Sequence, residues 1–200
     1  MSEKEWWAKW VRMLTTPQIS AIALASLLAI QQPEMFRGTW DYLVSVFFLG
    51  IFPLLAYPIA RIIPTTRSMG RKAERGLAFI FCLLGYLIVY VYGLCFSVDR
   101  QLFLLFETYF FSGLILAAVN VCFHIRASGH ACGTTGAILL VGSFLGWQWS
   151  MIFALVFLLS AWASITLERH TVQEFMLGSI CCVGGFAIGW FQNMLLSAVF

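Results

Sequence analysis

The sequence has little charge. Only 10% of its 200 residues are Asp, Glu, Lys or Arg and 61% are hydrophobic, whereas soluble domains carry about 25% charged residues. With a mean hydropathy of +0.88, the composition excludes a soluble protein and predicts an integral membrane protein. The net charge of +3 is too small and too widely spread to suggest a nucleic-acid partner.

Other familiar patterns are also missing. The first residues, MSEKEWWAKWVRML, carry acids and tryptophans in place of the short apolar core of a secretory signal. The six cysteines form no CxxC pair, so we interpret them as small buried hydrophobes rather than as a disulfide framework or a zinc site. No carboxylate cluster is present to hold a metal ion, and we expect no metal and no other cofactor.

Long apolar runs dominate the chain, and a helix needs about 20 such residues to cross a membrane. Four runs are clear: Tyr42–Ile63, Leu77–Phe96, Leu102–Ile125 and Phe175–Phe200. Ala131–Leu167 is long enough for two crossings split at Gly146–Trp149, and Gln18–Ile30 is either a tilted span or a partly inserted helix. Because open sheets cannot satisfy their edges in lipid, we predict an all-α, polytopic transmembrane bundle of six to seven spans.

The first residues predict an amphipathic helix. Trp6, Trp10 and Met13 share one helical face, and Glu5, Lys9 and Arg12 face away from it. Since tryptophan favours membrane interfaces, we expect residues 1–16 to lie in the interface and residues 17–200 to form one transmembrane domain. A soluble cap on the bundle is the alternative.

Basic residues are distributed unevenly around these spans. Seven spans would place ten of them on one side: Lys4, Lys9, Arg12, Arg61, Arg67, Arg71, Lys72, Arg75, Arg126 and Arg169. The other side keeps Arg37 and Arg100. The positive-inside rule therefore predicts that the crowded side of this cell-membrane protein is cytoplasmic, although arginines gathered to hold a phosphate would produce the same bias.

Three loops on that side carry most of the polar chemistry. They are TRSMGRKAERG (66–76), RASGH (126–130) and ERHTVQE (168–174). An even number of spans separates each from the next, so the loops can converge. Their arginines, two histidines and a carboxylate suit a phosphate ester, because guanidinium groups match phosphate oxygens and imidazoles attack or donate protons near neutral pH.

The second loop is also the start of a predicted helix. We expect Gly129 to allow a tight turn and Ala131 to begin a helix whose free amides point back at the loop, which is a typical anion site. His130 would lie at its edge. Gly133 and Gly136 are better explained by close helix packing.

These loops resemble the phosphatidic acid phosphatase type 2 superfamily of integral-membrane lipid phosphatases. Ser128-Gly129-His130 matches the family's P-S-G-H motif, with Ala127 in place of proline. His170 matches the nucleophilic histidine of the motif S-R-x5-H-x3-D, and Glu174 replaces its aspartate. The span order extends the resemblance, which is to small bacterial and archaeal members, over most of the chain.

The other family positions differ. In the third motif, Ala163 stands for the serine and Ser164 for the arginine that contacts phosphate in the family. In the first motif, K-x6-R-P, Ser68 stands for the lysine and Gly76 for the proline if Arg75 is the arginine.

The resemblance implies a phosphoric ester or diphosphate hydrolase that acts on a polyprenyl or diacylglycerol phosphate held among membrane lipids. His170 would attack phosphorus and form a phosphohistidine, Glu174 would orient its imidazole, and His130 would protonate the leaving group. The phosphate oxygens would be bound by Arg71, Arg75, Arg126 and the Ser128–Gly129 segment. Glu174 has a second interpretation, because Thr171-Val172-Gln173-Glu174 is a capping box.

Two other functions remain open. The loss of the motif arginine at Ser164 is what a catalytically degenerate member would show, one that binds a phosphorylated lipid without hydrolysing it. A small transporter fits less well, because the polar residues gather at one interface rather than at the midplane.

Overall fold

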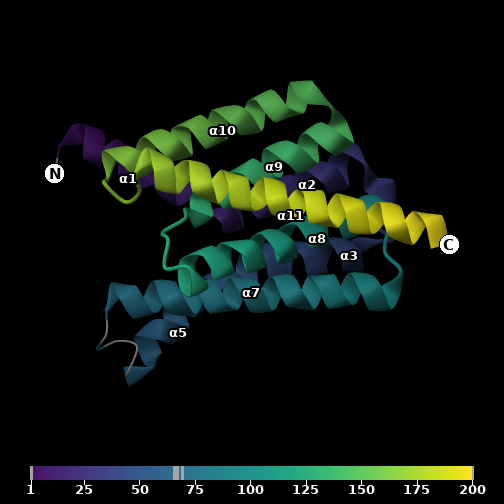
Figure 1. Ribbon diagram of the computed structural model, residues 1–200, viewed down its shortest axis with the longest axis horizontal. Coiled ribbons are helices and arrows are strands. Elements are labelled where there is room, and N and C mark those ends of the chain that lie inside the picture. The colour runs from purple at the N-terminus through teal and green to yellow at the C-terminus, as the bar shows by residue number, and fades with distance from the viewer. Residues whose placement is uncertain (1, 65–67, 69, 200) are drawn as a thin grey trace.

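Every regular element in the described part of the chain is helical, which confirms the predicted all-α bundle (Figure 1). The computed structural model describes residues 2–64, 68 and 70–199, without the side chains of residues 71, 72 and 197–199. The longer helices are α1 (Glu3–Leu14), α2 (Pro17–Gln31), α3 (Thr39–Val46), α7 (Arg71–Phe96), α8 (Arg100–Ala117), α9 (Gly129–Leu145), α10 (Trp147–Thr166) and α11 (Val172–Val199). The short ones are η1 (Pro33–Met35), η2 (Phe47–Ile51), α4 (Phe52–Leu54), α5 (Ala56–Ile62) and η3 (Ala118–Cys122).

Five stretches of the described chain are long and apolar enough to cross a membrane: Thr39–Ile62, Ala73–Phe96, Arg100–Cys122, Trp147–Thr166 and Val172–Leu196. α1 and α2 meet at a bend of 51° and would together form a sixth. The predicted count of six is therefore reached if α1 and α2 form one span, and the remaining one of the seven predicted crossings corresponds to α9. α9 has 17 residues, or about 26 Å at 1.5 Å per residue, which is shorter than a hydrocarbon core of about 30 Å.

The breaks between helices follow local sequence signals. α9 ends at Leu145 and α10 begins at Trp147, as predicted, because Gly146 has a φ of +96° that favours glycine. The π-helical turn η2 ends two residues before Pro53, which has no N–H for the helix ladder. Thr39–Ile62 is therefore a bent span built from several short helices.

α8 lies in the centre of the bundle and packs against α7 and α11. Glycines of α11 make this packing close, since a Cβ added at Gly189 would lie 2.8 Å from the Cβ of Glu107. Cys132, Cys181 and Cys182 are buried in the core as predicted, whereas Cys95 and Cys122 are exposed on the bundle surface.

The predicted N-terminal helix is confirmed as α1. Ser2 caps it, because Ser2 Oγ accepts from Glu5 N and Glu5 accepts from Ser2 N. Trp6, Trp7 and Trp10 are exposed. Figure 1 places α1, the α10–α11 turn and the first turns of α7 and α9 at one end of the bundle, and the C-terminus at the other. The end that carries α1 contains the three loops singled out in the sequence.

Candidate functional site

The second and third loops lie in direct contact. Ser128 N donates to the Glu174 carbonyl over 2.9 Å, and Arg126 Nη2 donates to the Arg169 carbonyl over 3.0 Å. Gly178 of α11 packs on the Ser128 backbone so closely that any added Cβ would overlap it. The structure thus brings together His130 at the start of α9 and His170 before α11.

His170 and Glu174 form a hydrogen-bonded pair. His170 Nδ1 lies 3.0 Å from Glu174 Oε2, and the side chains are 15% and 18% exposed. An ionised carboxylate only accepts hydrogen bonds, so the pair places the proton on Nδ1. The lone pair of His170 is then on Nε2, which is the atom a nucleophilic imidazole needs.

Glu174 also caps α11. Its Oε2 accepts from Thr171 N, and Glu174 N donates to Thr171 Oγ1, both over 3.2 Å. The two roles expected for Glu174 therefore coexist in one side chain. The capping bonds fix the carboxylate at the first turn of α11, and the fixed carboxylate orients the imidazole.

The electrostatic surroundings of His170 favour its neutral form. Partial burial lowers the pKa of His170 below its usual value; the Glu174 hydrogen bond opposes this, while the charges of Arg12 and Arg126 lower it further. The imidazole is consequently neutral near pH 7, with its proton on Nδ1 and a free lone pair on Nε2.

Arg126 faces the His170–Glu174 pair, but both terminal nitrogens of its guanidinium already have partners within the protein. Nη1 lies 3.5 Å from Glu174 Oε1 and Nη2 bonds the Arg169 carbonyl, although the side chain is 66% exposed. Arg126 thus holds the second loop against the third in addition to carrying charge at the site.

Ser128 and Gly129 differ from expectation. Ser128 is the N-cap of α9. Its buried hydroxyl accepts a hydrogen bond from Ala131 N over 3.4 Å, so the hydroxyl is already used by the helix. The expected tight turn at Gly129 is wrong, because Gly129 does not have the positive φ that would require glycine and already forms the first residue of α9. The helix start predicted at Ala131 therefore lies two residues earlier.

The first loop is only partly described. The side chain of Arg71 lies outside the described residues, and its backbone begins α7. Arg75, one turn further along α7, is exposed and close enough to the site for its charge to act on Arg12. Ser164 stands where the motif of the resembled family has an arginine. It is fully buried in α10, and its hydroxyl has no hydrogen-bond partner among the described residues.

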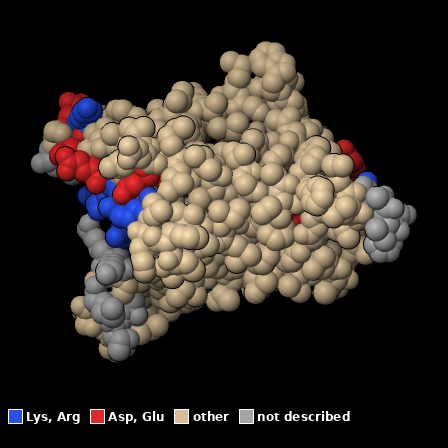
Figure 2. Space-filling view, in the orientation of Figure 1, with Lys and Arg blue, Asp and Glu red and all other residues tan. Residues whose placement is uncertain are grey.

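Arg12 of α1 is the site residue that the sequence did not reveal. Its charge acts on both His130 and His170. A basic residue on the polar face of an amphipathic helix is usually a solvated one, so the pattern gave no signal. Figure 2 shows Lys and Arg side chains gathered beside acidic ones at this end, with a smaller charged group at the opposite end and little charge between them.

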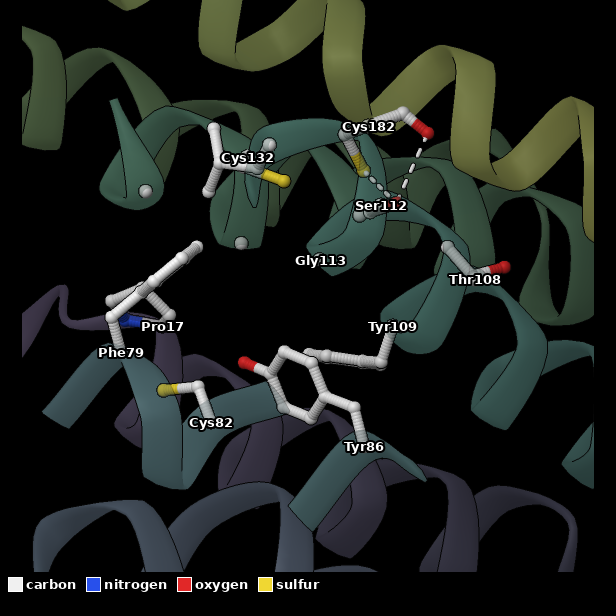
Figure 3. Close-up of a pocket in the computed structure, with 14 residues that line it drawn as sticks. Pro17, Phe79, Cys82, Tyr86, Thr108, Tyr109, Ser112, Gly113, Cys132 and Cys182 are labelled. Carbon is white, nitrogen blue, oxygen red and sulfur yellow. Dashed lines mark hydrogen bonds between the residues drawn. The ribbon is translucent and has the colours of Figure 1, made fainter. Parts of the chain in front are cut away.

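A mostly apolar cavity of about 70 Å³ adjoins the site. Gly129 and Cys132 of α9 line it, together with Pro17 from the start of α2 and Tyr86 and Tyr109 deeper in the bundle (Figure 3). The hydroxyl of Tyr109 is buried without a hydrogen-bond partner in the described structure. The cavity is lined at one end by Gly129, the residue before His130, and extends between helices.

Comparisons of the chain with protein-family models, with curated proteins and with solved structures find no match. The geometry of the site therefore carries the functional argument.

Proposed function

We propose that this chain is an integral-membrane phosphatase that hydrolyses the phosphate or diphosphate ester of a lipid. The observation that carries the proposal is the His170–Glu174 pair, at 3.0 Å, in a group of arginines beside a second histidine. An imidazole oriented by a carboxylate is a typical activated nucleophile, and surrounding guanidinium groups stabilise charge on phosphate oxygens.

The residues allow a two-step reaction. His170 Nε2 attacks phosphorus, the bond to the leaving oxygen breaks, and His130 gives that oxygen a proton. A phosphate dianion beside His130 favours the protonated imidazole that this step needs. A water molecule then attacks the phosphohistidine, His130 takes up its proton, and inorganic phosphate leaves with His170 restored.

The lipid class is proposed from the cavity. A phosphate held between His130 and His170 would have its ester oxygen beside Gly129, where the apolar cavity begins. A polyprenyl or diacylglycerol chain would continue from the cavity between the helices into the bilayer.

The test is phosphate release from a panel of lipid monophosphates and diphosphates by detergent-purified protein. His170→Asn should abolish release, since no imidazole remains to attack. His124→Asn is the matched control, because His124 is exposed in a neighbouring loop with a φ of +56° that Asn tolerates. Full turnover by His170→Asn would refute the mechanism.

Binding of a phosphorylated lipid without hydrolysis is the second candidate. One observation favours it: the buried Ser164 leaves no guanidinium at the family's arginine position. The same panel separates the two functions. Wild-type turnover of about 1 per second or more excludes the binding-only function, and retention of lipid phosphate without release supports it.

A further inference from the structure

Arg12 lies on the side of α1 that faces the bundle. Ala8, one turn earlier, is completely buried, and residues four apart share a helix face. α1 packs against α10, the helix that leads into the third loop. Pro17, which follows α1, contacts the first turns of α9, since a Cβ added at Gly133 would lie 2.6 Å from its Cβ. Arg12 therefore lies on the bundle side of α1, near enough to His130 and His170 for its charge to act on both.

The Nε of Arg12, a half-buried residue, is buried and has no hydrogen-bond partner in the described part of the chain. The charges of Arg75 and Arg169 repel this guanidinium, and the carboxylate of Glu174 is already bonded to His170, Thr171 and Arg126. A buried charged donor without a partner is costly, so the arrangement favours a bound anion.

We infer that Arg12 binds the phosphate group of the substrate and supplies the guanidinium that the third motif lacks at Ser164. The inference rests on the proposed function in so far as the anion is the substrate's phosphate. It makes α1 part of the active site rather than only a membrane anchor.

The burial of Ser164 and the packing of α1 are consistent with a guanidinium supplied by α1 in place of one on α10. Ser164 is on α10, against which α1 packs, and it is fully buried. The small serine leaves this part of α10 without a long cationic side chain, and the arginine arrives from the neighbouring helix. The planar guanidinium offers several donors in a fixed fork, which suits a phosphate better than an ammonium group.

The test measures the binding of inorganic phosphate and the hydrolysis of lipid phosphate separately, on full-length protein in detergent. Arg12→Met, which keeps an unbranched apolar stem without the guanidinium, should weaken phosphate-dependent thermal stabilisation and raise KM for lipid phosphate by about 10- to 100-fold, the usual range for a lost charge-assisted hydrogen bond. Arg12→Lys keeps the charge without the fork and should fall between Arg12→Met and wild type.

Lys9→Met is the matched control. Lys9 is on the same helix but exposed, so removing its charge should leave both measurements unchanged. Equal losses in Lys9→Met and Arg12→Met would reduce the effect to overall charge and overturn the inference. Unchanged phosphate binding in folded Arg12→Met would overturn it as well.

His170→Asn separates the inference from the proposed function. If wild type binds phosphate through Arg12 but releases none from any lipid, the phosphatase proposal fails and the Arg12 site stands. A different pattern would refute only the Arg12 inference. In that pattern wild type hydrolyses lipid phosphate, His170→Asn binds phosphate without hydrolysis, and Arg12→Met behaves as wild type in both measurements.

Discussion

At the scale of single residues, Glu174 joins helix formation to chemistry. One of its oxygens accepts from Thr171 N and from His170 Nδ1, and the other faces Arg126. Capping the first turn of α11 holds the carboxylate still, so the imidazole it orients is held as well. The side chain of Glu174 is long enough to reach back to both groups.

Substitutions at Glu174 should separate these two roles. Glu174→Gln preserves a capping box but removes the charge that fixes the His170 tautomer and pairs with Arg126. We expect kcat to fall by about 100-fold or more, with thermal stability changed by less than about 1 kcal/mol. Glu174→Ala should lose kcat and about 1 kcal/mol of helix stability together. Steady-state kinetics and thermal unfolding measure both, and equal stability losses in the two variants would contradict the division.

At the scale of helices, the site depends on how closely α11 approaches the second loop. Gly178 gives α11 a flat surface at Ser128, and the Ser128 N–H reaches the Glu174 carbonyl over 2.9 Å. The same approach places Arg126 against Glu174. A single glycine therefore sets the distance between the loop that carries His130 and the loop that carries His170.

Gly178→Ala should push α11 away from Ser128. The added methyl group overlaps the Ser128 carbonyl oxygen, which is backbone and cannot rotate aside. We expect a loss of about 1–3 kcal/mol of stability and a fall in lipid phosphate hydrolysis. Gly76→Ala is the control: it has no heavy atom within 4 Å of the added Cβ, and the helix of α7 should gain up to about 1 kcal/mol. Thermal unfolding of both variants tests the contact, and a stable, active Gly178→Ala protein would show that it is dispensable.

At the scale of the whole molecule, charge and chemistry gather at one end. The three loops and α1 lie together there, and α2 runs from this end toward the opposite one (Figure 1). The basic residues that suggested a cytoplasmic side include Arg12, Arg75 and Arg126 of the site. Part of the excess of basic residues at this end therefore belongs to the proposed phosphate site.

We predict that this end faces the cytoplasm, by the positive-inside rule. A single cysteine at Ser68, in a background without the six native cysteines, should resist an impermeant maleimide in intact cells and react once the membrane is opened. A cysteine at Asp99, between α7 and α8 at the other end, is the control and should react in intact cells. The reverse pattern would show that the arginines are gathered for phosphate and that the orientation is inverted.

The sequence by itself determined the helical class, the main apolar helices and the break at Gly146, whereas the pairing of His170 with Glu174 was implied by the family resemblance. The first three depend on local composition and on glycine's backbone freedom. The length of α9 was predicted less well. Its apolar run continues into α10, so hydrophobicity alone does not show that α9 has only 17 residues.

Only the tertiary structure decided which distant groups meet. Arg12 and Ser164 are about 150 residues apart in the chain, and only the packing of α1 against α10 brings the helices that carry them together. Arg126 is occupied by Glu174 and Arg169 rather than free, and Ser128 is a helix cap rather than an open hydroxyl. These features depend on packing between helices, which no periodicity within one segment records, because side-chain partners are set by the approach of separate elements.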